Sequence, residues 1–169
     1  MRFKTPEEKF SYHFHEAMAI CASEGWGDPT APGRTREIVM ANELGHRVGP
    51  TLSGPDAYNQ TGNALEYKST TGKSIAGTYN GISVQRSWPE QESYLRNKKL
   101  GCYSEHYISR FIRETGQIDE TWMLTGDTVC DILVPKLEKK FDTILSKKDP
   151  RLGASLTKTE IHKYGKRIK

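Results

Sequence analysis

The sequence predicts an α/β fold of the mixed (α+β) type, in which a mixed β-sheet is flanked by helices. Three observations support this prediction. The chain has 169 residues, a length that suits a single domain. Segments with helical spacing of apolar residues and segments typical of strands follow one another irregularly, so a regular β-α-β alternation is not expected. The sequence also contains no internal repeat and no low-complexity block.

Two helices and three strands are expected in the first half. Between residues 10 and 22, apolar residues recur near the spacing of an amphipathic helix. A second helix is predicted over residues 36–44, with Thr35 as its N-cap and Gly45 at its end. The strands should follow at 46–52, 64–69 and 79–85.

The second half is predicted to contain a helix, a hairpin and a further helix. Residues 105–114 place their large apolar side chains on one helical face. Two short strands at 121–124 and 128–134 flank a Thr-Gly-Asp turn signal, which favours a hairpin. Pro135 is then expected to start a helix that runs to about residue 146.

Charge is distributed unevenly along the chain. The formal net charge is +4, from 25 lysines and arginines against 21 acidic residues. Residues 147–169 contain eight of these basic residues and only two of the acidic ones, whereas the rest of the chain is close to neutral. We therefore expect a single domain over residues 1–146 and a basic C-terminal tail over residues 147–169. The tail can contact phosphate groups; a solvated terminus without a partner is the alternative.

Composition argues against several classes of protein. No apolar run approaches the ~20 residues that a bilayer requires, so no membrane partner is expected. The N-terminal residues lack the apolar stretch of a signal peptide, and a cytoplasmic location is the default expectation. Cys21, Cys102 and Cys130 are far apart, which argues against a disulfide framework and against a clustered zinc site.

Acidic and basic side chains meet around a predicted turn. Asp56 follows a Gly-Pro turn, and Glu66 and Lys68 lie two positions apart on a predicted strand, where they share one face. The intervening Gly62-Asn63 can fold the chain back and bring Asp56 beside them. Carboxylates are hard oxygen ligands suited to Mg²⁺. A neighbouring lysine can orient or deprotonate an attacking water and can neutralise charge on a phosphate. The pattern therefore predicts a Mg²⁺-dependent hydrolytic site.

These residues also resemble a known signature. Pro55-Asp56 followed by Glu66-Tyr67-Lys68 resembles the PD-(D/E)xK motif of nucleases, with the ten-residue separation found in small type II restriction endonucleases. The resemblance implies a restriction-endonuclease-like fold. It also implies that Asp56 and Glu66 are metal ligands, that the Tyr67 carbonyl is a further ligand, and that Lys68 is the catalytic lysine.

The upstream part of the motif leaves a choice open. The family often adds a glutamate from a preceding helix, and Glu37 and Glu43 both fit by position. The competing interpretation is that Glu66 and Lys68 form a weak surface ion pair on a solvent-facing strand. The Gly-Pro turn, the apolar strand around Glu-x-Lys and the acidic helix before it favour the nuclease interpretation.

Polar side chains after this strand are candidates for DNA contact. Arg, Asn and Gln can read base edges in the major groove, and a loop lysine can reach a phosphate. The candidates are Lys73, Asn80, Ser83, Gln85 and Arg86. An ordinary polar strand edge is the alternative for the last four, and a simple turn is the alternative for Lys73.

The sequence therefore predicts a Mg²⁺-dependent, sequence-specific endodeoxyribonuclease that hydrolyses phosphodiester bonds of double-stranded DNA. By the resemblance, it is a type II restriction enzyme. A homodimer is expected, because each subunit of a symmetric pair would cut one strand of a palindromic site. The alternatives are a phage, repair or toxin nuclease with the same chemistry, and a non-catalytic nucleic-acid-binding protein.

Overall fold

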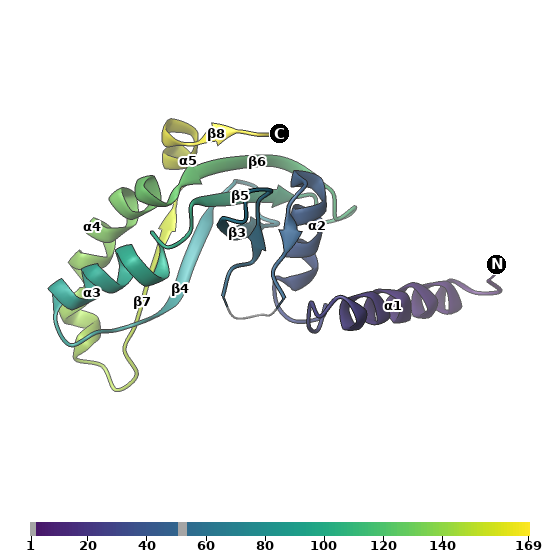
Figure 1. The fold of residues 1–169 in the computed structure, drawn as a ribbon, viewed down its shortest axis with the longest axis horizontal. Helices are drawn as coiled ribbons and strands as arrows, with labels where there is room; N and C mark the ends of the chain where they lie inside the picture. The colour runs from purple at the N-terminus through teal and green to yellow at the C-terminus, as the bar shows by residue number, and fades with distance from the viewer. Residues whose placement is uncertain (1–2, 51–53) are drawn as a thin grey trace.

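A computed structural model describes residues 3–50 and 54–169 and confirms the mixed α+β fold (Figure 1). A mixed sheet has the strand order β1-β2-β3-β5-β6-β8, and β4 and β7 form a second, two-stranded sheet. The strands are β1 (Arg47–Val48), β2 (Ala57–Tyr58), β3 (Ala64–Thr70), β4 (Gly77–Ser83), β5 (Glu105–Phe111), β6 (Ile118–Thr125), β7 (Arg151–Leu156) and β8 (Lys166–Arg167). The helices are α1 (Pro6–Ser23), α2 (Arg34–Leu44), α3 (Trp88–Tyr94), the π-helical turn η1 (Leu95–Lys99), α4 (Gly126–Leu145) and α5 (Lys158–Tyr164).

Helices cover both faces of the larger sheet. Strands β3 and β5 run parallel, and the crossover between them carries β4, α3 and η1. One apolar cluster includes Met40 of α2 and Tyr107 of β5, and the other includes Leu133 of α4 and Ile108 of β5. Because Tyr107 and Ile108 are consecutive in one strand, their side chains point to opposite faces. Helix α2 therefore packs on one face and α4 on the other.

The elements predicted for the first half are largely confirmed. Of the segment 46–52, Arg47–Val48 forms β1, whereas residues 51–53 lie outside the described part of the chain. The other predicted segments correspond to α1 (10–22), α2 (36–44), β3 (64–69) and β4 (79–85).

The N-cap predicted for α2 is wrong. The helix begins at Arg34 and its N-cap is Gly33, which has a φ of 93° that favours glycine. The hydroxyl of Thr35 instead donates a hydrogen bond to the Pro29 carbonyl at 2.6 Å. Thr35 thus ties the preceding loop to the first turn of the helix.

The helix predicted over residues 105–114 is wrong, because this segment forms β5. Strand β5 lies between β3 and β6, and residues 106–109 are all buried. A strand buried on both faces shows a continuous apolar run without alternation. A short run of this kind does not distinguish a strand from a helix.

The hairpin predicted over residues 121–134 is also wrong. Strand β6 ends at Thr125, and α4 begins at the next residue and continues through Pro135. The Thr125 hydroxyl accepts a hydrogen bond from the Thr128 amide at 3.2 Å, which makes Thr125 the N-cap of α4. The Thr-Gly-Asp signal is therefore a helix start, and Pro135 lies inside the helix rather than at its beginning.

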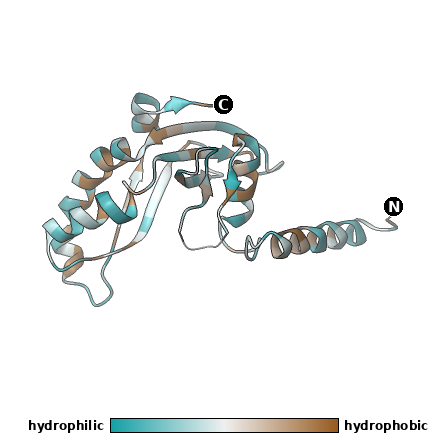
Figure 2. Cartoon of the chain, viewed as in Figure 1, coloured by the Kyte–Doolittle hydropathy of each residue, from teal (hydrophilic) through white to brown (hydrophobic). Residues whose placement is uncertain are grey.

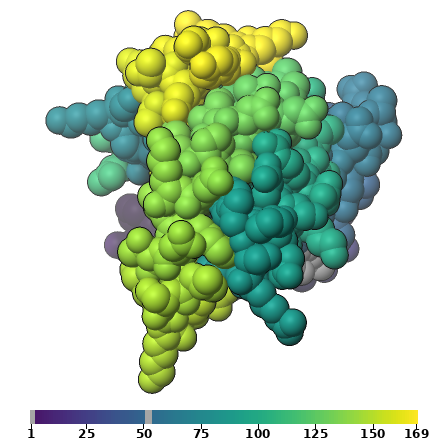
Figure 3. All heavy atoms as spheres, turned by 90° about the vertical axis from the view of Figure 1, so that its left-hand side faces the viewer, coloured from purple at the N-terminus to yellow at the C-terminus, as the bar shows by residue number. Residues whose placement is uncertain are grey.

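The C-terminal segment 147–169 is not an extended tail. Strand β7 pairs antiparallel with β4, and β8 pairs antiparallel with β6. Leu152, Leu156 and Ile161 are buried in the apolar cluster beneath α4. Figure 3 shows the last residues, in yellow, as a layer across one end of the molecule. The basic residues of this segment are therefore carried on structured elements.

Helix α1 extends away from the rest of the molecule (Figure 1). All of its residues except Cys21 are exposed. Phe10, Phe14 and Met18 recur every four residues and form an exposed apolar stripe, and apolar residues of α1 appear brown in Figure 2. No helix in the described ranges is both long and apolar enough to cross a bilayer. The stripe is thus an apolar surface that the described part of the chain leaves exposed.

Candidate active site

The β2–β3 hairpin brings Asp56 next to Glu66 and Lys68. Asp56 directly precedes β2, which pairs antiparallel with the start of β3. A carboxylate oxygen of Asp56 accepts a hydrogen bond from the Tyr67 amide at 2.7 Å. Because Tyr67 lies between Glu66 and Lys68, this bond holds Asp56 beside both residues. The structure therefore brings together the three side chains that the sequence grouped.

The hairpin depends on a turn organised by Asn59. The Asn59 side-chain oxygen accepts hydrogen bonds from the Thr61 amide, the Thr61 hydroxyl and the Asn63 amide, at 2.8 to 3.1 Å. Gly62 has a φ of 84°, which a residue with a side chain rarely adopts. The predicted turn at Gly62-Asn63 therefore fixes the register that places Asp56.

Glu66 and Lys68 form an ion pair on one face of β3. Their side chains are 11% and 22% exposed, respectively, so the pair is mostly shielded from solvent. The Lys68 ammonium also lies over the ring of Tyr79 in β4, 5.0 Å from the ring centre. This environment differs from the solvated strand edge of the competing interpretation, where an ion pair contributes about 0–1 kcal/mol.

Asp56 lies in an environment that disfavours its charge. Burial raises the pKa of its carboxyl to about 7, and the nearby charges of Glu66 and Glu37 act in the same direction. The Tyr67 amide and the Lys68 ammonium oppose these effects only in part. Carboxylates held together with a raised pKa are typical of sites that bind cations or carry out acid-base chemistry.

Strand geometry also directs the Tyr67 carbonyl toward Asp56. In an extended strand, the N–H and C=O groups of one residue point to the same side. The Tyr67 N–H points to Asp56, as its hydrogen bond shows. The Tyr67 carbonyl therefore lies on the Asp56 side of β3, where the resemblance expects a metal-binding oxygen.

The structure separates the two upstream glutamates. Glu37 forms an ion pair with the buried Arg34 at 3.2 Å, and its charge contributes to the raised pKa of Asp56. Glu43 is exposed and binds Lys169 near the C-terminus at 3.1 Å. The charge of Glu37 therefore acts on the site, whereas Glu43 lies on a different surface.

The available oxygen atoms fit Mg²⁺ better than a transition metal. Asp56, Glu66 and the Tyr67 carbonyl supply only hard oxygen donors. Residues 3–50 and 54–169 contain no group of three or more His, Cys, Asp or Glu side chains that could hold a metal ion. Mg²⁺ commonly needs only one or two carboxylates, because it retains water and shares substrate phosphate oxygens. The donor set thus suits an ion whose coordination is completed by substrate.

Two of the residues proposed for DNA contact lie on a two-stranded ribbon. Asn80 and Ser83 are on the exposed side of β4, and β4 is paired with β7. From β7, Arg151 donates a hydrogen bond to the Ser83 hydroxyl at 3.5 Å, and Ser155 bonds the hydroxyl of Thr78 at 3.0 Å. A two-stranded ribbon has dimensions that fit the major groove.

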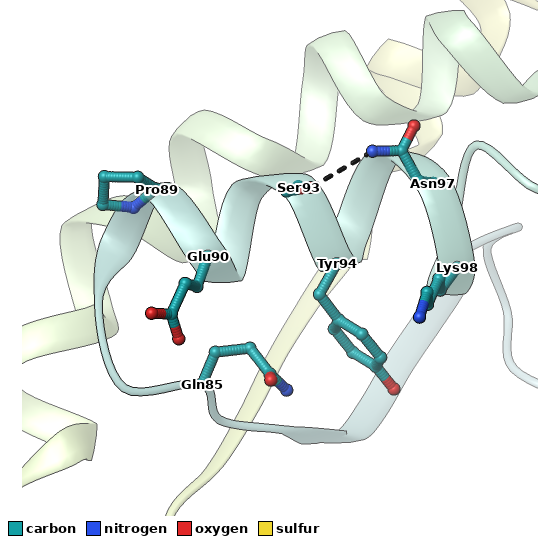
Figure 4. Close-up of a pocket in the computed structure, with 7 residues that line it drawn as sticks. All are labelled: Gln85, Pro89, Glu90, Ser93, Tyr94, Asn97 and Lys98. Atoms are coloured by element: carbon teal, nitrogen blue, oxygen red, sulfur yellow. Dashed lines mark hydrogen bonds between the residues drawn. The ribbon is translucent and has the colours of Figure 1, made fainter.

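The remaining candidates for DNA contact lie at both ends of β4. Lys73 is exposed in the bend before the strand, and Arg86 is exposed after it. Gln85 is half-buried, and its backbone amide donates to the Gln91 side chain at 2.8 Å. Figure 4 shows the Gln85 side chain near Tyr94 in a surface pocket of about 540 Å³ beside α3. The structure therefore places Gln85 away from the ribbon face that carries Asn80.

Sequence reasoning missed several residues around the site. Arg151 and Ser155 were missed because their segment was treated as a tail, although Leu152, Ala154 and Leu156 alternate with polar residues as in a strand. Tyr79 contacts Lys68, and His106 contacts Tyr79. No local sequence signal indicates these contacts, because they form between strands that are distant in the sequence.

No protein-family model matches this chain, and the comparison with curated proteins gives no match. The geometry of the hairpin and its surroundings is therefore the basis for assigning a function.

Proposed function

We propose that this protein is a Mg²⁺-dependent endodeoxyribonuclease of the PD-(D/E)xK type that hydrolyses phosphodiester bonds in double-stranded DNA. The observation that carries the proposal is the convergence of Asp56, Glu66 and Lys68 at the β2–β3 hairpin, together with the raised pKa of the Asp56 carboxyl. The proximity of these three side chains supports the proposal.

The roles follow from the chemistry of each group. Asp56, Glu66 and the Tyr67 carbonyl would hold Mg²⁺, which when bound polarises a phosphoryl oxygen and lowers the pKa of a coordinated water. Lys68 pairs with Glu66 and would therefore lie next to a phosphate bound at the proposed metal site. There it could stabilise negative charge that develops on the phosphate, or orient the attacking water. The carboxylate of Glu37 lies near enough to this site to raise the pKa of Asp56 and would add its own negative charge there.

The β4–β7 ribbon supports double-stranded DNA as the substrate. Its exposed side carries Asn80, Ser83 and Arg151, which are hydrogen-bonding groups that can read base edges. The neighbouring helix α4 supplies Lys136, Lys139 and Lys140, which line a surface hollow together with Asn80. Base-reading groups flanked by basic ones are typical of a surface that binds DNA in one register.

The exposed stripe of α1 supports a homodimer. In proteins, most of the stability of a helix comes from the packing of its apolar face. The stripe of Phe10, Phe14 and Met18 repeats at helical spacing, so two α1 helices can pack along it by a two-fold axis. Such a dimer would carry two hairpin sites, one from each copy.

A restriction system in the cytoplasm is the biological setting that we propose, because a symmetric dimer with a base-reading ribbon suits a palindromic site. A cleavage assay separates this setting from the alternatives. Discrete fragments from a long DNA indicate sequence-specific cleavage, whereas a smear indicates a general phage, repair or toxin nuclease. Binding of DNA without cleavage would identify a non-catalytic binding protein.

The central test is cleavage of supercoiled plasmid by the full chain. We expect cleavage with Mg²⁺, none with EDTA, and a loss of about 100-fold or more in Asp56→Ala and Lys68→Ala, since electrostatic groups at such sites contribute on this scale. Absence of Mg²⁺-dependent cleavage by the parent protein, at any DNA sequence supplied, would refute the proposal.

Glu37 and Glu43 provide a matched pair of variants. Glu37→Gln removes a charge that raises the pKa of Asp56, so the acid limb of the pH-rate profile should move to lower pH. Glu43→Gln removes the same charge from the other end of α2 and should leave the profile unchanged. Equal effects of the two substitutions would contradict the placement of Glu37 at the site.

A further inference from the structure

The Lys68 side chain contacts Tyr79 and Gly77 of β4, two residues that the nuclease signature does not include. Its ammonium pairs with Glu66 and lies 5.0 Å from the centre of the Tyr79 ring. Tyr79 belongs to β4, which pairs with β7 and not with β3. The contact between Lys68 and Tyr79 therefore joins the larger sheet to the two-stranded ribbon.

Strand β4 passes directly against Lys68 at Gly77. A Cβ atom added at Gly77 would lie 3.6 and 3.7 Å from the Lys68 Cβ and Cγ atoms, and 3.2 Å from the Ile108 Cγ1 atom. The backbone of β4 thus rests on the aliphatic part of the lysine. Two residues further along, Tyr79 points to the same side of β4 and reaches the ammonium group.

The orientation of the Tyr79 ring is fixed by a buried chain of hydrogen bonds. The His106 Nε2 atom lies 3.0 Å from the Leu100 carbonyl, and a carbonyl can only accept, so Nε2 carries the proton. The ring is fully buried, and burial favours the neutral imidazole, which has a single N–H. Its Nδ1 atom must then accept a hydrogen bond from the Tyr79 hydroxyl, 2.9 Å away.

These hydrogen bonds restrict the rotation of the Tyr79 ring. Tyr79 and His106 are both buried, with 4% and 0% exposed, so neither side chain has space for another rotamer. The Tyr79 hydroxyl is committed to His106, and the ring face is left for Lys68. A cation over an aromatic face is attracted by the ring quadrupole, more strongly when water is excluded.

We propose that Tyr79 is a positioning residue for Lys68, whose ammonium is held beside Glu66 by a ring that His106 and the Leu100 carbonyl keep in place. The catalytic meaning of this contact rests on the proposed nuclease function. The contact also couples the DNA-facing ribbon to the reaction centre, because Asn80 follows Tyr79 in the same strand and points to its opposite, exposed side. Strand β4 thus carries Asn80, a candidate for base contact, on its exposed side, and Tyr79, which contacts Lys68, on its buried side.

The first test uses nuclear magnetic resonance and does not require cleavage. In protein labelled with ¹³C at lysine Cε, the Lys68 signal is assigned by its loss in Lys68→Arg. Protons above an aromatic ring are shifted upfield, so we expect an upfield Lys68 Hε signal in the parent protein and in Tyr79→Phe, which keeps the ring. In Tyr79→Leu the signal should return to the position of the other lysines.

The second test measures single-turnover cleavage and, separately, DNA affinity with Ca²⁺ in place of Mg²⁺. Tyr79→Leu should lower the cleavage rate by about 2- to 30-fold, the range that a lost cation–π contact gives. DNA affinity should stay unchanged, and Tyr79→Phe should retain most of the rate. The matched control is Tyr107→Leu, which removes a buried tyrosine on the opposite face of the sheet and should leave the Lys68 signal in place.

The outcomes separate this inference from the nuclease proposal. A Lys68 signal at the ordinary lysine position in the parent protein, or one that Tyr79→Leu does not move, overturns the positioning role whether or not DNA is cut. If Tyr79→Leu does not fold, the parent and Tyr79→Phe spectra still decide the question. An upfield signal in a protein that never cuts DNA supports the contact and refutes only the nuclease function.

Discussion

Among single residues, Asp56 couples the stability of the protein to pH. Its pKa rises from an ordinary value of 3.8 to about 7 on folding, chiefly through burial and the charge of Glu66. Between these two pH values the folded protein retains a proton that the unfolded chain releases. The contribution of Asp56 to stability is therefore complete below about pH 4 and is lost as the pH rises through about 7.

This sign predicts that Asp56→Asn stabilises the protein at high pH. The amide oxygen of Asn can still accept the hydrogen bond from Tyr67, but the substitution removes the buried charge. We expect the free energy of unfolding without metal to rise by about 2–4 kcal/mol at pH 8 and to change little at pH 4. Denaturant unfolding at several pH values measures this, and a difference that does not vary with pH would contradict it.

Divalent cations provide the companion measurement. Mg²⁺ or Ca²⁺ should raise the melting temperature of the parent protein at pH 8, because the ion binds only the folded site. The same cations should have little effect on Asp56→Asn, which lacks one of the proposed ligands. A similar rise in both proteins would show that the ion binds elsewhere.

The residues of the site differ in how far sequence could predict them. Asp56, Glu66 and Lys68 were predictable because a single hairpin with a Gly-Asn turn unites them. The choice between Glu37 and Glu43 was not, because it depends on how α2 docks on the sheet. Tyr79 and His106 could not be anticipated either, since their contact requires the pairing of strands that are distant in sequence.

At the scale of elements, Pro135 offers a test of the observed path of the chain. Proline inside a helix removes a backbone hydrogen bond and crowds the preceding turn, at a cost of about 3 kcal/mol. Because Pro135 lies within α4, Pro135→Ala should raise the free energy of unfolding by about 1–3 kcal/mol. If the helix instead began at Pro135, as the sequence predicted, the substitution would give no gain.

A second substitution in α4 should act in the opposite direction. Thr125→Ala removes the side-chain oxygen that caps the first turn and should lower the free energy of unfolding by about 1 kcal/mol. Thermal or denaturant unfolding of both variants measures the pair. A neutral Thr125→Ala would contradict its assignment as the N-cap.

The elements that sequence misassigned share a physical cause. Strand β5 is buried on both faces, so it lacks the alternation that identifies a strand at an open surface. The Thr-Gly-Asp of the β6–α4 junction contains residues that serve in turns and in helix caps alike. Strand β7 was missed because basic residues dominate the composition of residues 147–169. Local patterns identified α1 and β3 because each has a periodicity that tertiary contacts do not override.

At the scale of the whole molecule, the stripe on α1 predicts the oligomeric state. Phe10→Glu combined with Phe14→Glu places charges in the proposed helix contact and should weaken the dimer by about 100-fold or more, since burying each phenylalanine contributes about 1.5–3 kcal/mol. Tyr12→Glu is the matched control, because Tyr12 lies outside the stripe. Sedimentation equilibrium distinguishes the states.

The outcome also bears on the products of cleavage. The dimer should make double-strand breaks, whereas a monomer released by the two phenylalanine substitutions should nick one strand. A parent protein that is monomeric at micromolar concentration would refute the dimer. So would a dimer that the phenylalanine substitutions leave intact.

The outer strands of the larger sheet also influence how copies of the chain meet. Strands β1 and β8 lie at its two edges, each is two residues long, and they contain Arg47, Lys166 and Arg167. A long apolar edge can accept a strand from a neighbouring molecule and extend into fibrils, whereas a short, charged edge resists such growth. In concentrated solutions, the edges of the larger sheet should therefore not seed β-rich aggregates.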